Sequence, residues 1–162
     1  IAWLEDDRPE QRIEMLSTLL DSWTDGRIKL FLTAAGLRLR RRHRALFLEG
    51  SYIPLDVTDT HARHIVAFGR RHGSSVALAV VPRLTHRLFG GHAPRPPAAE
   101  VWQDTVIEVP APISDATFTH VLTGETLTCE RDGSRAWLRA ADLLRHIPAA
   151  LAVAGHEEAH SS

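Results

Sequence analysis

Residues 75–84, SVALAVVPRL, decide the fold class of this 162-residue chain. A short apolar run that is rich in valine and alanine and is followed by a proline is typical of a strand buried on both faces. The preceding runs HIVAFGRR (64–71) and YIPLDVT (52–58) change to a period of two, which favours strands over helices. The chain from about residue 51 onward is therefore predicted to form β-sheet.

Four more strand-like runs follow a loop rich in proline and glycine, GGHAPRPPAA (90–99). They are TVIEVP (105–110), TFTHVL (117–122), ETLTCER (125–131) and RAWLRA (135–140). Thr123-Gly124 and Asp132-Gly133 are hairpin-type turns between them. The run IPAALAVA (147–154) fits either a closing strand or a short helix. About seven antiparallel strands of this length predict a sandwich.

The N-terminal third has the period of a helix instead. Pro9 suits a first helical turn, and apolar residues then share one face up to the Asp25-Gly26 break. A second helix continues to Leu46 with its own apolar stripe: Ile28, Phe31, Leu32, Ala35, Leu39 and Leu46. The predicted fold class is α+β, with two N-terminal helices followed by an antiparallel β-sandwich.

Composition limits the function classes. The chain is 44% hydrophobic with a net charge of −1, which excludes a disordered chain and a globally basic nucleic-acid binder. The single cysteine excludes an intrachain disulfide, and no apolar run approaches a membrane span. We expect a cytoplasmic protein without membrane contact. The first residue is Ile1, and we interpret the chain as part of a longer polypeptide.

The stretch from Arg38 to Arg44 has six arginines and histidines in seven positions. It could be a phosphate-binding helix or the solvated face of a helix. Nucleic-acid readers place aromatic or amide side chains beside their cations, and residues 36–46 contain neither. Cations also suit a helix C-terminus, so the solvated face is favoured and no nucleic-acid partner is predicted.

Several motifs resemble metal-binding or catalytic patterns but lack the further residues that such sites need. HEEAH (156–160) fits a zinc-peptidase pattern, yet only two serines follow and no third ligand is visible. His61 and His64 also lack a third ligand and are interpreted as surface residues. Cys129 is interpreted as strand packing, and Asp6 and Asp7 as helix-capping residues. No metal site, no cofactor and no catalytic residue is predicted in this chain.

Trp102 and Trp137 could be platforms on which a sugar ring stacks. In a strand-rich sequence such residues more often pack in a core or a loop. A glucan-binding sandwich that uses one of them is kept as the alternative function.

A resemblance extends from Asp25 to Ala152. Its segments, in order along the chain, are DGRIKLFLT, LRLRRRHRALFLEGSYIPL, HIVAFGRR, AVVPRL, WQDTVIEVP, VLTGE and LLRHIPAALA. In this order they resemble the C-terminal region of the maltooligosyltrehalose synthase family, within the α-amylase superfamily (glycoside hydrolase family 13). The basic helix belongs to this pattern, which favours a scaffold role for it.

The resemblance implies a domain order and a reaction. Residues 1–50 would end a catalytic (β/α)8 barrel, residues 51–155 would form the sandwich, and residues 156–162 would be a polar tail. The family's reaction converts the reducing-end α-1,4 bond of a maltooligosaccharide into an α,α-1,1 bond, an intramolecular transfer in trehalose biosynthesis. A barrel needs about 250 residues, so the catalytic acids would lie upstream and this chain alone would be inactive.

The resemblance also implies a contact with the substrate. LEDDRPEQR (4–12) matches part of a family loop that borders the sugar site, through Asp7, Arg8 and Pro9. Asp7 and Arg8 are the candidate substrate-binding residues, and the maltooligosaccharide is the expected partner through the parent barrel. Without that barrel, the apolar stripe of the second helix is expected to form an exposed patch.

Overall fold

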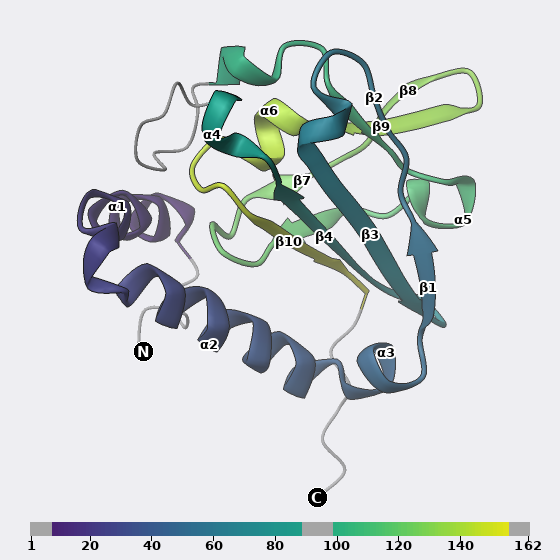
Figure 1. The fold of residues 1–162 in the computed structure, drawn as a ribbon. Helices are drawn as coiled ribbons and strands as arrows, with labels where there is room; N and C mark the ends of the chain where they lie inside the picture. Colours follow the sequence, from purple (N-terminus) through teal and green to yellow (C-terminus); the bar gives the residue numbers. More distant parts are fainter. Residues whose placement is uncertain (1–7, 89–98, 156–162) are drawn as a thin grey trace, which may run out of the picture.

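The structure is a computed structural model that describes residues 8–88 and 99–155. Its N-terminal part is helical (Figure 1). Helix α1 spans Pro9–Asp21 and begins at the proline, as predicted. A 3₁₀ helix, η2 (Trp23–Asp25), ends at Gly26, whose φ of 80° favours glycine. Helical structure before the sheets is therefore confirmed.

The second helix is broken near its C-terminal end. Helix α2 spans Arg27–Arg42 and helix α3 spans Arg44–Leu48. Between them His43 has φ −117° and ψ 54°, outside the helical region, so the chain leaves the α2 axis there. Leu46 is consequently buried at 1% exposure. The prediction of one continuous helix to Leu46 is wrong at this residue.

Six strands form the larger sheet, in the order β1-β3-β4-β10-β6-β7, with antiparallel pairing throughout. They are β1 (Ser51–Pro54), β3 (Ile65–His72), β4 (Ser75–Pro82), β6 (Phe118–His120), β7 (Thr126–Leu127) and β10 (Ala150–Ala154). The prediction that strand β4 is buried on both faces holds for one face only: Val76, Leu78 and Val80 are at most 3% exposed, whereas on the other face Ala77 is buried but Val81 is 40% exposed. The run IPAALAVA (147–154), which fitted either a strand or a short helix, contains strand β10.

The smaller sheet has four antiparallel strands in the order β2-β5-β9-β8. They are β2 (Val57–Thr58), β5 (Val106–Glu108), β8 (Glu130–Asp132) and β9 (Arg135–Arg139). Two predicted strands are each divided between the sheets: YIPLDVT forms β1 and β2, and ETLTCER forms β7 and β8. The chain turns the first corner at buried Leu55, as strands that change sheets do in packed two-sheet folds.

Short helical segments connect the strands. They are η3 (Ala62–His64), α4 (Thr85–Leu88), η4 (Ala99–Trp102), α5 (Ala111–Ser114) and α6 (Ala140–Leu143). The sequence patterns did not predict them, because four residues are too few to show a helical period. Most of the predicted loop 90–99 and the whole tail 156–162 lie outside the described residues.

The two sheets share one hydrophobic core, called the inter-sheet core here. It contains Val76, Leu78 and Val80 of β4 together with Ile107 of β5 and Leu138 of β9. Trp102 and Phe118, both 0% exposed, are its largest members. The α+β class is thereby confirmed, with two antiparallel sheets packed on a common interior.

A second cluster, called the helix core here, joins the helices to the sheets. It consists of Leu16, Leu19, Leu20, Ile28, Phe31, Ala35, Leu122 and Ile147. The expected exposure of the α2 stripe is therefore wrong: helix α1 and the two residues outside the helices, Leu122 and Ile147, pack with it. Leu30 and Leu37, on another side of α2, are instead 67% and 61% exposed.

None of the helices in the described part of the chain is long and apolar enough to cross a bilayer.

Candidate functional site

A polar cavity of about 340 Å³ lies where strands of both sheets meet helix α6. Its charged lining residues are Glu125, Glu130, Arg139, Asp142 and Arg145, and Thr126 and Thr128 add hydroxyl groups. The chain crosses from β7 to β8 beside it, which brings the two sheets together at this place. This volume lies at the lower end of the range for small-molecule sites.

Glu130 is held between two side chains of strand β9. Residues Glu130 and Trp137 are paired across β8 and β9, and the Trp137 Nε1–H donates to Glu130 Oε2 over 3.3 Å. Arg139 Nη1 lies 3.8 Å from the same oxygen. Trp137 is half-buried, and the guanidinium carbon of Arg135 lies 5.8 Å from its ring centre. Glu130, which lines the cavity, thus contacts one indole and lies close to one guanidinium group.

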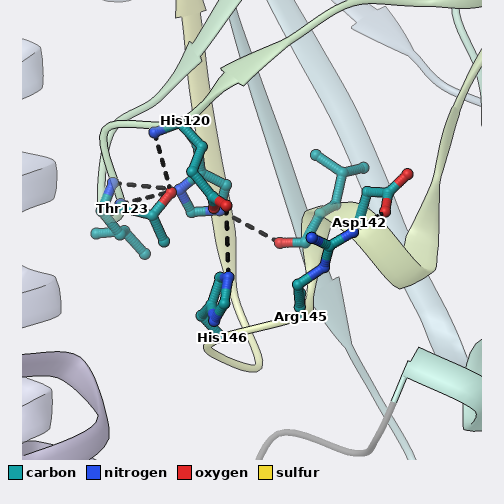
Figure 2. A network of polar contacts seen from close by, with 8 residues as sticks. His120, Thr123, Asp142, Arg145 and His146 are labelled. Atoms are coloured by element: carbon teal, nitrogen blue, oxygen red, sulfur yellow. Dashed lines mark hydrogen bonds and ion pairs between the residues drawn. The ribbon is translucent and has the colours of Figure 1, made fainter. Parts of the chain in front are cut away.

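His120 lies at the centre of a polar network beside α6, whose residue Leu143 lines the cavity (Figure 2). Its Nδ1 accepts hydrogen bonds from the backbone N–H groups of Leu122 and Thr123, each over 3.3 Å. Its Nε2 lies 3.2 Å from the Leu143 carbonyl, so Nε2 carries the ring proton and donates it. Burial lowers the pKa of His120, and a neutral ring satisfies all three contacts. The ring connects the β6–β7 turn to α6.

Each acidic group of the cavity lies close to a basic side chain. His146 Nε2 lies 3.4 Å from Glu125 Oε1, and Arg145 pairs with Asp142 (Figure 2). A glycosidase general acid needs a carboxyl group whose surroundings raise its pKa, as an apolar pocket does. Carboxylates in ion pairs beside threonine hydroxyls are instead suited to hydrogen bonds with the hydroxyls of a neutral ligand. The arrangement can bind such a ligand and has no recognisable catalytic pair.

The two tryptophans singled out from the sequence have different surroundings. Trp102 is 0% exposed in the inter-sheet core, so it has no surface on which a sugar could stack. Trp137 does not itself line the polar cavity, but it is half-buried and contacts Glu130, which does, so it is kept as a candidate platform. No sequence spacing connected it with Glu125 or Asp142, because the three come from different elements.

Of the two predicted substrate-binding residues, only Arg8 lies in the described part of the chain, and it is not among the printed lining residues of this cavity. Asp7 lies outside the described residues, as do Asp6 and HEEAH. Arg8 is exposed and occupies the N-cap position of α1, without a capping hydrogen bond from its side chain. A contact of Asp7 and Arg8 with substrate stays a prediction.

The other candidate residues for chemistry are structural. His64 is buried rather than on the surface: Arg63 Nε donates to its Nε2 over 3.2 Å, and its Nδ1 lies 3.4 Å from the Arg83 carbonyl. Burial raises the pKa of the half-buried Cys129 thiol, which makes it a poor nucleophile. Within residues 8–88 and 99–155, no group of three His, Cys, Asp or Glu residues is placed to hold a metal ion.

The chain is similar to two curated proteins, from the CDC 1551 and H37Rv strains of Mycobacterium tuberculosis, each named "Putative maltooligosyl trehalose synthase". Each is 38% identical over 98 residues, which is 60% of this chain. The match covers 11% of each relative, so the chain spans about a tenth of their length. No protein-family model matches the chain, and no solved structure matches it significantly. These matches indicate a distant, partial relationship to the two proteins of that name.

Proposed function

We propose that this chain is the C-terminal, non-catalytic part of a (1→4)-α-D-glucan 1-α-D-glucosylmutase, a maltooligosyltrehalose synthase. The observation that carries the proposal is the 38% identity over 98 residues to the Mycobacterium tuberculosis relatives. In this proposal residues 1–50 complete the catalytic barrel and residues 51–155 form the C-terminal domain. The parent enzyme would rearrange the reducing end of a maltooligosaccharide.

The chemistry requires residues beyond this chain. A retaining transfer needs one carboxylate to attack the anomeric carbon and a second carboxylic acid to protonate the leaving oxygen. The carboxylates that line the polar cavity each lie close to a basic side chain. The freed glucose must also remain enclosed while it turns, since water would otherwise hydrolyse the intermediate. We therefore assign catalysis to the barrel of the parent protein and a supporting role to this chain.

The test compares the purified 162-residue chain with the full-length protein encoded by its gene, each incubated with maltohexaose. We expect the full-length protein to remove reducing ends without releasing glucose, and the 162-residue chain to do neither. Glucose release that accounts for all consumed substrate would indicate a hydrolase instead. Conversion by the 162-residue chain alone would contradict the assignment of catalysis to the barrel.

The proposed contact of Arg8 with substrate has its own test. In the full-length protein, Arg8→Gln is expected to raise KM for maltohexaose about tenfold, because a hydrogen bond from a charged donor is lost. The control is Arg27→Gln, an exposed arginine at the start of α2. Equal effects of the two substitutions would remove Arg8 from the substrate site.

A second candidate function is favoured by the polar cavity itself. Trp137, the paired carboxylates and the threonine hydroxyls could hold a glucan chain without any catalysis. Calorimetry with maltohexaose tests this directly on the 162-residue chain. Trp137→Ala should weaken binding about two- to tenfold, the size expected for one aromatic contact. Trp23→Ala, which removes an exposed tryptophan next to α2, should leave it unchanged.

A further inference from the structure

A second cavity, of about 440 Å³ and called the apolar mouth here, lies at one end of the two-sheet fold, beside the β3–β4 hairpin. Edge strand β1 and the hairpin form one side of it. The start of helix α5, which follows strand β5 of the smaller sheet, forms the other side (Figure 1). Its described lining residues are Ser51, Ile53, Arg71, Gly73, Pro110 and Pro112.

The register of the sheet directs Ile53 into this space. Ile53 is paired with Gly69, and Gly69 is paired with Leu78 of the inter-sheet core. Residues directly opposite each other in an antiparallel sheet share a face, so Ile53 lies on the core side of the sheet. Gly69 has no side chain there, and a Cβ on it would lie 3.1 Å from Leu78 Cδ2. Ile53 therefore packs against the inter-sheet core and gives the mouth an apolar inner wall.

Arg71 lies on the same face, nearer the hairpin. It is paired with Val76, another member of the inter-sheet core. Its Nε donates to the Gly73 carbonyl over 3.2 Å, and its Nη atoms make no hydrogen bond or ion pair with the residues that the structure describes. The next residue, His72, points to the opposite face, where its Nε2 lies 3.7 Å from Glu49 Oε2. That carboxylate is therefore directed away from Arg71.

A guanidinium group beside an apolar hollow suits a particular kind of ligand. The planar N–H donors of arginine match the two oxygens of a carboxylate. Ile53 and the exposed rings of Pro110 and Pro112 offer carbon surface, which is favourably covered by a hydrocarbon chain. A volume of about 440 Å³ lies within the range of small-molecule sites.

We propose that the apolar mouth binds a medium-chain monocarboxylate, with the carboxylate on the Nη atoms of Arg71 and the hydrocarbon chain against Ile53 and the two prolines. The proposal does not depend on the proposed function, since a maltooligosaccharide has neither a negative charge nor a hydrocarbon chain. A ligand at this place would contact β1 of the larger sheet and the chain after β5 of the smaller sheet. Its binding would therefore stabilise the packing of the two sheets.

The test is calorimetry on the 162-residue chain at pH 7 with octanoate, acetate and octanol as probes. Acetate has the charge without the chain, and octanol has the chain without the charge. We expect octanoate to bind at least about tenfold more tightly than either, because the loss of a charge-assisted contact alone costs about that factor.

Three variants locate the binding. Arg71→Gln should weaken octanoate binding about tenfold. Arg83→Gln, at an exposed arginine beyond the far end of β4, should change it less than about twofold because a distant exposed charge is screened. Ser51→Trp keeps Arg71 but places an indole in the mouth, and it should abolish octanoate binding.

Circular dichroism establishes whether each variant is folded, and Arg71→Lys, which keeps the charge but loses the planar donors, replaces Arg71→Gln if that variant does not fold. The proposal is overturned if octanoate does not bind at millimolar concentration. Equal weakening by Arg71→Gln and Arg83→Gln would also overturn it, because binding would then follow the general charge of the chain. Octanol binding as tight as that of octanoate would remove the carboxylate from the proposal, and unchanged binding in Ser51→Trp would place the ligand elsewhere.

Discussion

The inter-sheet core and the helix core differ in where their residues come from. The inter-sheet core takes residues from strands of both sheets and from connections between Leu55 and Ala154. Among the described residues, the helix core takes its buried members from α1 and α2, together with Leu122 and Ile147 from farther along the chain. A layer attached through so few buried apolar residues opens at a lower cost than the sheets do. The helical layer is therefore expected to be the less stable part of one folded unit.

The largest effect is expected in the inter-sheet core. Phe118 is 0% exposed there, and Phe118→Ala should lower the free energy of unfolding by about 3–5 kcal/mol. Urea denaturation followed by circular dichroism measures this loss. Amide exchange should speed up in β4 and β10 together, since both strands border this core. A loss below that of the matched helix-core variant, Phe31→Ala, would reverse the comparison.

Phe31→Ala makes the same substitution in the helix core, where Phe31 is 3% exposed. We expect a loss near the low end of the same range, about 3 kcal/mol, because a core with few members can partly collapse around the deleted ring. Hydrogen exchange should then be faster in α1 and α2 while β4 stays protected. Equal acceleration in β4 would show that the two cores open as one cooperative unit.

His120 connects the two cores. Because it is a titratable group, the stability of the connection between them is expected to depend on pH. Its ring accepts from the N–H of Leu122, in the helix core, and donates to the carbonyl of Leu143, in the inter-sheet core. Burial lowers its pKa in the folded chain, while an unfolded histidine takes up a proton near pH 6.5. Acidification below about pH 6.5 therefore favours the unfolded chain, by at most about 1.4 kcal/mol per pH unit for this one group.

The variant His120→Asn removes this titration. Its free energy of unfolding should fall less steeply than that of the unsubstituted chain between about pH 6.5 and pH 5. His86→Asn, at an exposed histidine, should keep the original slope. If the two variants have the same pH dependence, protonation of His120 does not lower the free energy of unfolding, and this explanation is wrong.

Local patterns predicted the parts of the fold that depend on local burial. The apolar run of β4 and the helical stripe from Ile28 to Leu39 record which faces are covered, so element type could be read from them. The division of ETLTCER between two sheets could not be predicted from local patterns, because it depends on pairing with strands far along the chain. The break at His43 could not be predicted either, because no proline or glycine stands at or next to this residue.

The sites were less predictable than the fold. In the polar cavity, only the spacing of Asp142 and Arg145 is a local signal of pairing. Glu125 and Glu130 reach the same cavity through the change of sheet.

The smallest effect is expected on the exposed side of α2, beside the stripe that contains Phe31. Leu30 and Leu37 are 67% and 61% exposed, and glutamine has nearly the helix propensity of leucine. Leu30→Gln and Leu37→Gln should each change the free energy of unfolding by less than about 0.5 kcal/mol, in contrast to Phe31→Ala. Urea denaturation at two protein concentrations, with sedimentation at both, measures this difference. A loss above about 1 kcal/mol that grows with concentration would mean that this side of the helix is covered by a second copy. The helix core would then be part of a larger interface, and the helical layer would owe its stability to that contact rather than to Leu122 and Ile147 alone.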